Sequence, residues 1–241
     1  MSYLLVFGTI SLLITLHELG HFLAARRMGI PIARFSVGFG RKLWGFKTGK
    51  TEYWLSWIPC GGYVLPALQD DDAFEQVPLW KRIVFSLGGP VANLLGAFLC
   101  LSLMNAARTG FSVSSVISLP LEQVCHMAIQ IGSLIPALFS RPDHLSSIFG
   151  IVAGGGAYVG LNFVKLLQFS VLLNVNLAVF NLIPILPLDG GKIVMSVLRK
   201  IHQPLRKLEL PLTVGGWALL LGLTLYATAL DISRVAHGTL G

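Results

Sequence analysis

Four long apolar runs divide the chain, and each is long enough to form a membrane-spanning helix. Asp, Glu, Lys and Arg are absent from residues 1–17, 83–107, 166–188 and 210–230. A helix needs about 20 mostly apolar residues to cross the hydrocarbon core of a bilayer. With the apolar residues that flank these runs, we expect spans at about 3–25, 83–107, 160–187 and 210–230. Together they predict a single domain over residues 1–241.

The segments between the spans carry weaker patterns. Between the first two spans, aromatic and β-branched residues flank a turn at residues 47–50, which predicts a β-hairpin. Between the second and third spans, apolar residues recur at helical spacing from Leu121 to Leu138. This amphipathic helix lies either on the outer membrane surface or against the four spans, and the sequence leaves both placements open.

Composition and charge support a membrane protein and orient it. The chain is 54% hydrophobic and 12% charged, whereas a soluble domain is about 25% charged. Fourteen of the 18 Lys and Arg residues lie in two loops, at 26–82 and 192–207. The positive-inside rule places both loops in the cytoplasm and both termini outside. The net charge of +7 therefore orients the chain in its lipid bilayer and does not indicate a nucleic-acid partner. The expected fold class is membrane α-helical, with four transmembrane helices, a cytoplasmic-side β-hairpin and an outer amphipathic helix.

Polar residues at metal-site spacing interrupt the first span. The sequence "HELGH" places His17 and His21 four residues apart, so both imidazoles project from one face of a helix. In the H-E-x-x-H pattern two imidazoles bind Zn²⁺ and the glutamate, here Glu18, acts as general base. Ionisable residues inside a membrane are rare and indicate function by default. The first span therefore predicts two zinc ligands and a catalytic base.

A catalytic zinc site needs a third protein ligand and an open position for water. Asp189 is the carboxylate that ends a long apolar span, and Pro184 and Pro187 break the helix just before it. We predict that Asp189 is the third ligand. The alternative is that Asp189 only caps a helix that begins at the following glycines.

These motifs together resemble a known family. "HELGH" in the first span and "NLIPILPLDGG" at residues 181–191 resemble the site-two proteases, which are zinc intramembrane metalloproteases. Further matches are "GGYV" at residues 61–64 and "GGPVAN" at residues 88–93. The resemblance implies that His17, His21 and Asp189 bind one Zn²⁺ per chain and that Glu18 is the catalytic base.

The resemblance also suggests residues that hold substrate or orient the site. The candidates for substrate binding are Asn93, Asn176, Asn181, Gly61, Gly62 and Tyr63. An exposed strand edge of the hairpin is expected to capture an unwound substrate by main-chain pairing, and proline at residues 55–58 would test this. A hairpin that serves only as scaffold is the alternative.

The expected activity follows from the resemblance and the motif. We expect a zinc metalloendopeptidase that cuts transmembrane segments of single-span membrane proteins, such as regulators or leftover signal peptides. Glu18 would assist the attack of a zinc-bound water near the cytoplasmic face of a bacterial inner membrane. The loop of about 50 residues between spans two and three is too short for the PDZ domains of many relatives, so we expect a compact form. The alternative is an inactive zinc-binding membrane protein or a transporter.

Overall fold

The fold combines long helices with one small sheet. The computed structural model describes residues 1–67, 74, 76–140 and 146–236. In chain order, its elements are α1 (Ser2–Met28), β1 (Ile32–Thr48), β2 (Thr51–Pro66), α3 (Leu79–Thr109), η1 (Ser114–Ser118), α4 (Leu119–Ser140), α5 (Ile148–Val159), α6 (Phe163–Asn181), α7 (Asp189–Ile201), η3 (Gln203–Leu208) and α8 (Glu209–Ala236).

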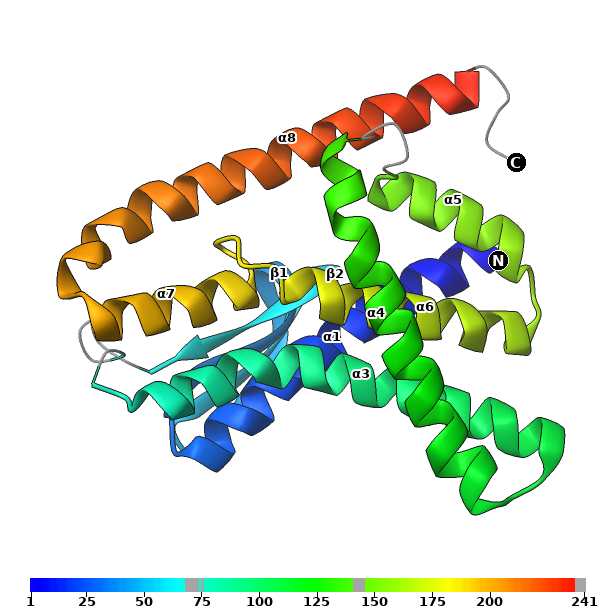
Figure 1. Ribbon diagram of the computed structural model, residues 1–241, viewed down its shortest axis with the longest axis horizontal. Coiled ribbons are helices and arrows are strands. Elements are labelled where there is room, and N and C mark those ends of the chain that lie inside the picture. The colour runs from blue at the N-terminus through cyan, green and yellow to red at the C-terminus, as the bar shows by residue number, and fades with distance from the viewer. Residues whose placement is uncertain (68–73, 75, 141–145, 237–241) are drawn as a thin grey trace.

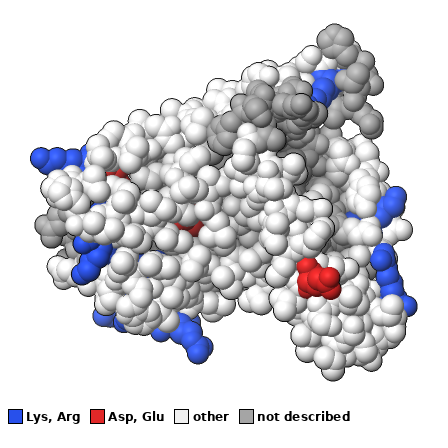
Figure 2. All heavy atoms as spheres, viewed as in Figure 1, with Lys and Arg blue, Asp and Glu red and all other residues white. Residues whose placement is uncertain are grey.

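Four of these helices, α1, α3, α6 and α8, are long and apolar enough to cross a membrane. They run roughly along the long axis of the molecule (Figure 1). On the face drawn in Figure 2, Lys and Arg gather toward the two ends of this axis, and the surface between them is almost free of charge. Large apolar side chains on these helices, such as Leu12, Leu95 and Leu221, are exposed. The chain is therefore an integral membrane protein with lipid-facing helices, as the apolar pattern predicts.

The helices α1 and α3 pack against each other in antiparallel directions. Their backbones meet at Gly20 and Gly88, where neither residue has a side chain that would separate them. The helix α6 packs on α3 through a buried cluster that contains Ala97, Leu101, Val171 and Val175. Close backbone contact is a common way for helices to associate in membranes. It holds α1, the helix that carries "HELGH", directly beside α3.

The helix α4 packs across α3 and α6. Its buried Val124 and half-buried Met127, Ala128 and Ile131 join the cluster formed by those two helices. Of the two placements that the sequence left open, packing against the spans is the one found here. Its exposed residues are both apolar and polar, with Leu121 and Ile129 beside Glu122 and Gln130.

The third predicted span is shorter as a helix than the range 160–187. The helix begins at Phe163 because the Asn162 side chain caps it, accepting hydrogen bonds from Val164 N–H at 2.9 Å and Lys165 N–H at 3.1 Å. It ends at Asn181, and residues 182–188 form an irregular segment that includes both prolines. A new helix, α7, begins at Asp189 and continues in roughly the same direction (Figure 1).

The predicted hairpin is present, and both of its strands are long and bent. Its turn lies at residues 48–51, where Gly49 has a φ of 60°. Within β1, residues 34–37 pair with residues 52–55 on one side and with residues 62–65 on the other. Leu55 also pairs with Trp44, so it lies inside the sheet and not at an edge. In the described part of the chain, residues 62–65 pair only with β1, which makes this segment an edge strand.

The sheet lies against α1 along much of that helix. Phe22 and Ala25 of α1 pack with Ile32, Phe35 and Tyr53 of the strands. Further along α1, the Ser11 hydroxyl donates a hydrogen bond to the Pro59 carbonyl. Because Ser11 precedes His17 by six residues, the bend in β2 reaches beyond the level of His17 toward the N-terminal end of α1.

The helix α8 is attached to the other elements near its two ends. At its start, Glu209 pairs with Arg199 of α7, and Gly216 lies against the Leu186 carbonyl. At its far end, Asp231 accepts a hydrogen bond from Ser147 N–H at 2.7 Å, just before α5. Between these points most side chains of α8 are exposed, and Figure 1 shows the helix standing apart from α6.

Candidate metal centre

Two of the predicted ligands come from one face of α1. His17 and His21 are both 6% exposed and sit four residues apart on the helix. Gly89 of α3 lies directly against both imidazoles, and a Cβ at this position would overlap Nε2 of each ring. The absence of a side chain at Gly89 therefore makes room for the two histidines between α1 and α3.

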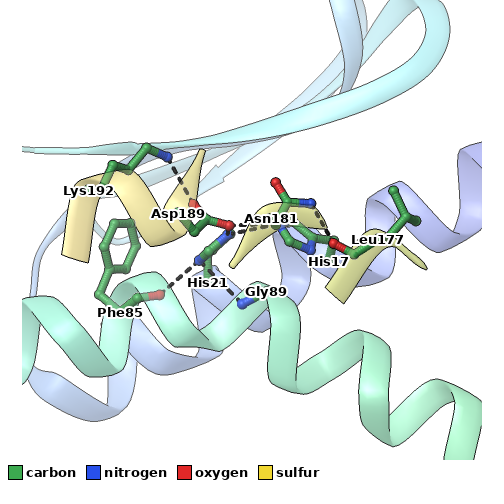
Figure 3. A network of polar contacts seen from close by, with 8 residues as sticks. All are labelled: His17, His21, Phe85, Gly89, Leu177, Asn181, Asp189 and Lys192. Carbon is green, nitrogen blue, oxygen red and sulfur yellow. Dashed lines mark hydrogen bonds and ion pairs between the residues drawn. The ribbon is translucent and has the colours of Figure 1, made fainter. Parts of the chain in front are cut away.

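The third predicted ligand lies at the start of α7, directly after the irregular segment between α6 and α7. Residues 182–188 double back against the start of α7, and Gly190 and Gly191 lie against the backbone of this segment. Asp189 is the first residue of α7 and is 3% exposed. The N-cap position of α7 is occupied by Leu188 and not by Asp189, whose side chain points to the histidines (Figure 3). The capping alternative is therefore not what the structure shows.

The three side chains meet in a compact triangle. Asp189 Oδ2 lies 3.1 Å from His17 Nε2 and 3.1 Å from His21 Nε2, and the two Nε2 atoms are 3.1 Å apart. A tetrahedral zinc ion with bonds of about 2.0–2.1 Å separates its ligand atoms by about 3.3 Å. The observed triangle is close to that separation, so the donor atoms and their spacing fit a tetrahedral zinc ion.

Proton positions also favour a metal over hydrogen bonding alone. His21 Nδ1 lies 2.8 Å from the Phe85 carbonyl oxygen, which only accepts, so Nδ1 carries a proton. The 3.3 Å approach of Gly89 N–H to the same nitrogen is then a contact between two donors. In the neutral ring, Nε2 presents a lone pair to the Asp189 carboxylate. A single proton bridges only two of the three facing atoms, whereas one cation contacts all three.

Asp189 is also held by Lys192, which follows it by three residues on α7. Lys192 Nζ donates a hydrogen bond to Asp189 Oδ1 at 3.0 Å, leaving Oδ2 for the histidines. Burial alone raises the pKa of the Asp189 carboxyl, but the imidazoles of His17 and His21 and the ammonium of Lys192 hold this pKa well below its usual range. Asp189 is therefore an ionised carboxylate, the form that binds a metal.

A cavity of about 710 Å³ opens on the triangle. Glu18, Asn181 and Lys192 line it together with the three ligands. Apolar walls come from β2 and α8, with Val64, Trp217 and Leu220 among their residues. The Glu18 side chain faces the same space as the triangle, so it is placed to exchange protons with a water there.

The six substrate-binding candidates separate into three groups. Asn181 lines the cavity, and its amide donates to the Leu177 carbonyl at 2.8 Å. Gly62 lies against Glu18, and a Cβ there would be 3.3 Å from Glu18 Cγ. The other four do not line the cavity: Asn176 donates to Leu172, Gly61 and Tyr63 contact Phe39, and Asn93 is buried between helices.

Comparison with known proteins identifies the family. The family model described as Peptidase family M50 matches residues 5–223. The chain belongs to peptidase family M50. This confirms the resemblance to the site-two proteases that the motifs indicated.

Individual M50 relatives match a smaller part of the chain. A protein of Xylella fastidiosa named "Putative zinc metalloprotease" is 39% identical over 104 residues, which cover 39% of this chain and 23% of the relative. The "Regulator of sigma E protease" of Haemophilus influenzae is 40% identical over 112 residues, covering 40% of this chain and 25% of the relative. The alignments thus span about a quarter of the length of these curated relatives.

Two parts of the centre could not be read from the motifs alone. The Phe85 carbonyl orients His21, but a backbone group carries no sequence signal. Lys192 has a signal, because it follows Asp189 by three residues on a helix and such pairs face each other. In the sequence, Lys192 was counted only among the basic residues at 192–207 that orient the chain.

Proposed function

We propose that the protein is a zinc-dependent intramembrane endopeptidase that cleaves transmembrane segments of single-span membrane proteins. Membership of family M50 and the triangle of His17, His21 and Asp189 support this proposal. The decisive observation is that Glu18 shares a cavity with all three ligands and binds none of their donor atoms. A purely structural zinc site has four protein ligands and no need of a general base.

His17, His21 and Asp189 would bind the metal, and Glu18 would transfer protons. Zinc, when bound, polarises a water and the substrate carbonyl. Glu18 takes a proton from the attacking water and gives it to the leaving amine nitrogen. Asp189, held by Lys192, and His21, held by Phe85, stay in fixed orientations during both transfers. The apolar walls of the cavity accept side chains of an unwound transmembrane segment.

The edge strand at residues 62–65 supplies a place for that segment. A peptide bond within a helix is shielded by its own hydrogen bonds and must be unwound before attack. Among the described residues, residues 62–65 pair with β1 on one side only, and Val64 lines the cavity. An unwound segment that pairs with this edge lies beside Glu18, because Gly62 contacts the Glu18 side chain.

The proposal includes an orientation in a bacterial inner membrane. The ligands lie near the end of α1 that carries Arg26 and Arg27, and α7 carries Lys192, Arg199 and Lys200 beyond Asp189. By the positive-inside rule this end of the bundle faces the cytoplasm and both termini face outward. Membrane-bound regulators and leftover signal peptides are the substrates that this location offers.

The test is the substitution Glu18→Gln in purified protein. The amide keeps the size of the side chain but cannot accept the proton, so cleavage of a transmembrane reporter should fall at least 10²–10⁴-fold, roughly the loss typical of general acid–base catalysis. Zinc measured by elemental analysis should stay at about one ion per chain. The matched control is Glu122→Gln, an exposed residue of α4, which should cut at the wild-type rate.

Three other outcomes would change the assignment. Wild-type cleavage by the Glu18→Gln variant would remove Glu18 from the mechanism. Loss of zinc together with activity would make Glu18 a ligand. Zinc binding by the wild-type protein with no cleavage of any reporter would favour the alternative, an inactive zinc-binding protein or a transporter.

A further inference from the structure

The two histidine ligands differ in how their second ring nitrogen is held. Histidines that bind a metal through one nitrogen almost always donate the other N–H to an acceptor, which fixes the ring and raises its basicity. His21 follows this rule through the Phe85 carbonyl. His17 Nδ1 is buried and has no hydrogen-bond partner among the described protein groups. The acceptor for His17 is therefore still to be identified.

Two buried asparagines beside His17 also have unpaired atoms. Asn93 of α3 is 0% exposed, and neither its amide oxygen nor its amide nitrogen has a partner in the described chain. Asn174 of α6 is 1% exposed; its nitrogen donates to the Ser170 carbonyl at 3.0 Å, while its oxygen is unpaired. Buried polar groups without partners cost folding free energy, so the unpaired atoms of these three residues call for an explanation.

The geometry of α3 brings these groups together. Gly89 contacts the His17 imidazole, and Gly96 contacts both the Asn174 amide and Leu16, the residue before His17. Asn93 lies between these two glycines, at positions i, i+4 and i+7 of one helix face. Asn93 therefore lies on the α3 face between the contact with the His17 imidazole and the contact with the Asn174 amide, and neither asparagine lines the open cavity.

We propose that Asn93 is a positioning residue that holds the His17 ligand through one buried water shared with Asn174. The water accepts the His17 Nδ1–H and donates its two protons to the amide oxygens of Asn93 and Asn174. This arrangement uses each unpaired oxygen once and gives the water three hydrogen bonds, which is typical of a buried water. It also explains why Asn93 is buried between helices and does not line the cavity.

The inference rests on the metal centre and is independent of whether the protein cuts peptides. Its readout is therefore zinc affinity, measured by competition with a chelator, and the visible spectrum of the cobalt-substituted protein. Asn93→Leu removes the acceptor at similar volume and should weaken zinc binding about 10–100-fold, the usual effect of losing such a partner. The cobalt spectrum should change as the His17 ring loses its fixed orientation.

Companion variants separate this role from a packing defect. Asn93→Asp keeps an acceptor oxygen in the same place and should bind zinc close to the wild-type affinity. Asn174→Leu should weaken zinc binding, and the double variant should lose little more than Asn93→Leu alone, because both act through one water. Asn105→Ala, at a half-buried asparagine further along α3 whose amide donates to Gln123 of α4, is the matched control and should bind zinc normally.

The opposite results would overturn the proposal. If Asn93 were only an unpaired buried amide, Asn93→Leu would leave zinc affinity and the cobalt spectrum unchanged and would not lower the melting temperature of the metal-free protein. Strictly additive losses in the double variant would show that no water is shared. Failure of Asn93→Asp to bind zinc would exclude the acceptor role. A peptidase assay that fails while these affinities behave as expected would count against the proposed function alone.

Discussion

At the scale of single residues, the centre depends as much on what is missing at Gly89 as on the ligands. Both imidazoles occupy the space where a side chain of α3 would otherwise lie. The sequence indicated His17, His21 and Asp189 because their spacing and membrane position are unusual. It included Gly89 in the motif "GGPVAN" without giving it a role, and it did not indicate Phe85, because a backbone carbonyl leaves no mark on a pattern of residue types.

This leads to a prediction for Gly89→Ala. Alanine favours a helix interior over glycine by about 1 kcal/mol, so α3 itself should not suffer. The added Cβ overlaps the imidazole nitrogens, however, and should displace at least one ligand, lowering zinc affinity more than 10-fold on the scale of a disturbed metal site. Zinc content and affinity of the purified variant are the measurements.

The control for this prediction is Gly132→Ala in α4. Gly132 also lies within a helix, but a Cβ there meets no atom within 4 Å. This variant should bind zinc like the wild type. If Gly89→Ala bound zinc equally well, the histidines would have to occupy positions other than those described here.

At the scale of elements, the sheet shows how much of its structure residue types along the strands can predict. The strands and their turn followed from aromatic and β-branched residues around residues 47–50. The order of pairing did not, because each strand bends and pairs in more than one place. Leu55, expected near a capturing edge, is paired on both sides, and the edge beside the cavity lies at residues 62–65 instead. The position of α4 could not be predicted either, because an apolar helix face can pack against lipid or against other helices.

The edge strand at residues 62–65 leads to a prediction that compares proline substitutions at two adjacent positions. Adjacent residues of a strand direct their N–H groups to opposite sides, so either Val64 or Leu65 points its N–H away from β1. Proline at the outward position should leave the sheet and zinc intact but lower cleavage at least 10-fold, by roughly 1.4 kcal/mol, about one net hydrogen bond to substrate. Proline at the other position should break pairing with β1 and lower the melting temperature.

The cleavage rate, zinc content and melting temperature of the two proline variants test whether substrate pairs with this edge strand. If both folded variants hold zinc and cut the reporter at the wild-type rate, capture at this edge is wrong and the hairpin is scaffold.

At the scale of the whole molecule, the four spans could be predicted because charge is almost absent from long stretches of the chain. Which residues of the spans meet could not be predicted, because this depends on close contacts such as that of Gly20 with Gly88. The metal centre links α1 to α7, two elements that are far apart in sequence. Zinc should therefore stabilise the whole fold and not only its own ligands.

Removal of the metal tests this expectation. At free zinc 100-fold above its dissociation constant, binding should add about 2.7 kcal/mol to stability, which corresponds to a rise of about 5–10 °C in Tm for a chain of this size. Chelation should lower the melting temperature by this amount and added zinc should restore it. His17→Ala should melt at the same temperature with and without zinc. An unchanged Tm in the wild-type protein would show that the centre carries no folding energy.

The separation of the ligands along the chain has a consequence in time. His17 and His21 precede Asp189 by 172 and 168 residues, so a ribosome must add all of these residues before the third predicted ligand exists. During that interval the first helix carries its glutamate and both imidazoles but cannot complete the triangle. The metal centre of a growing chain is therefore incomplete while its apolar helices enter the bilayer. It is completed only when Asp189, at the start of α7, reaches the two histidines of α1.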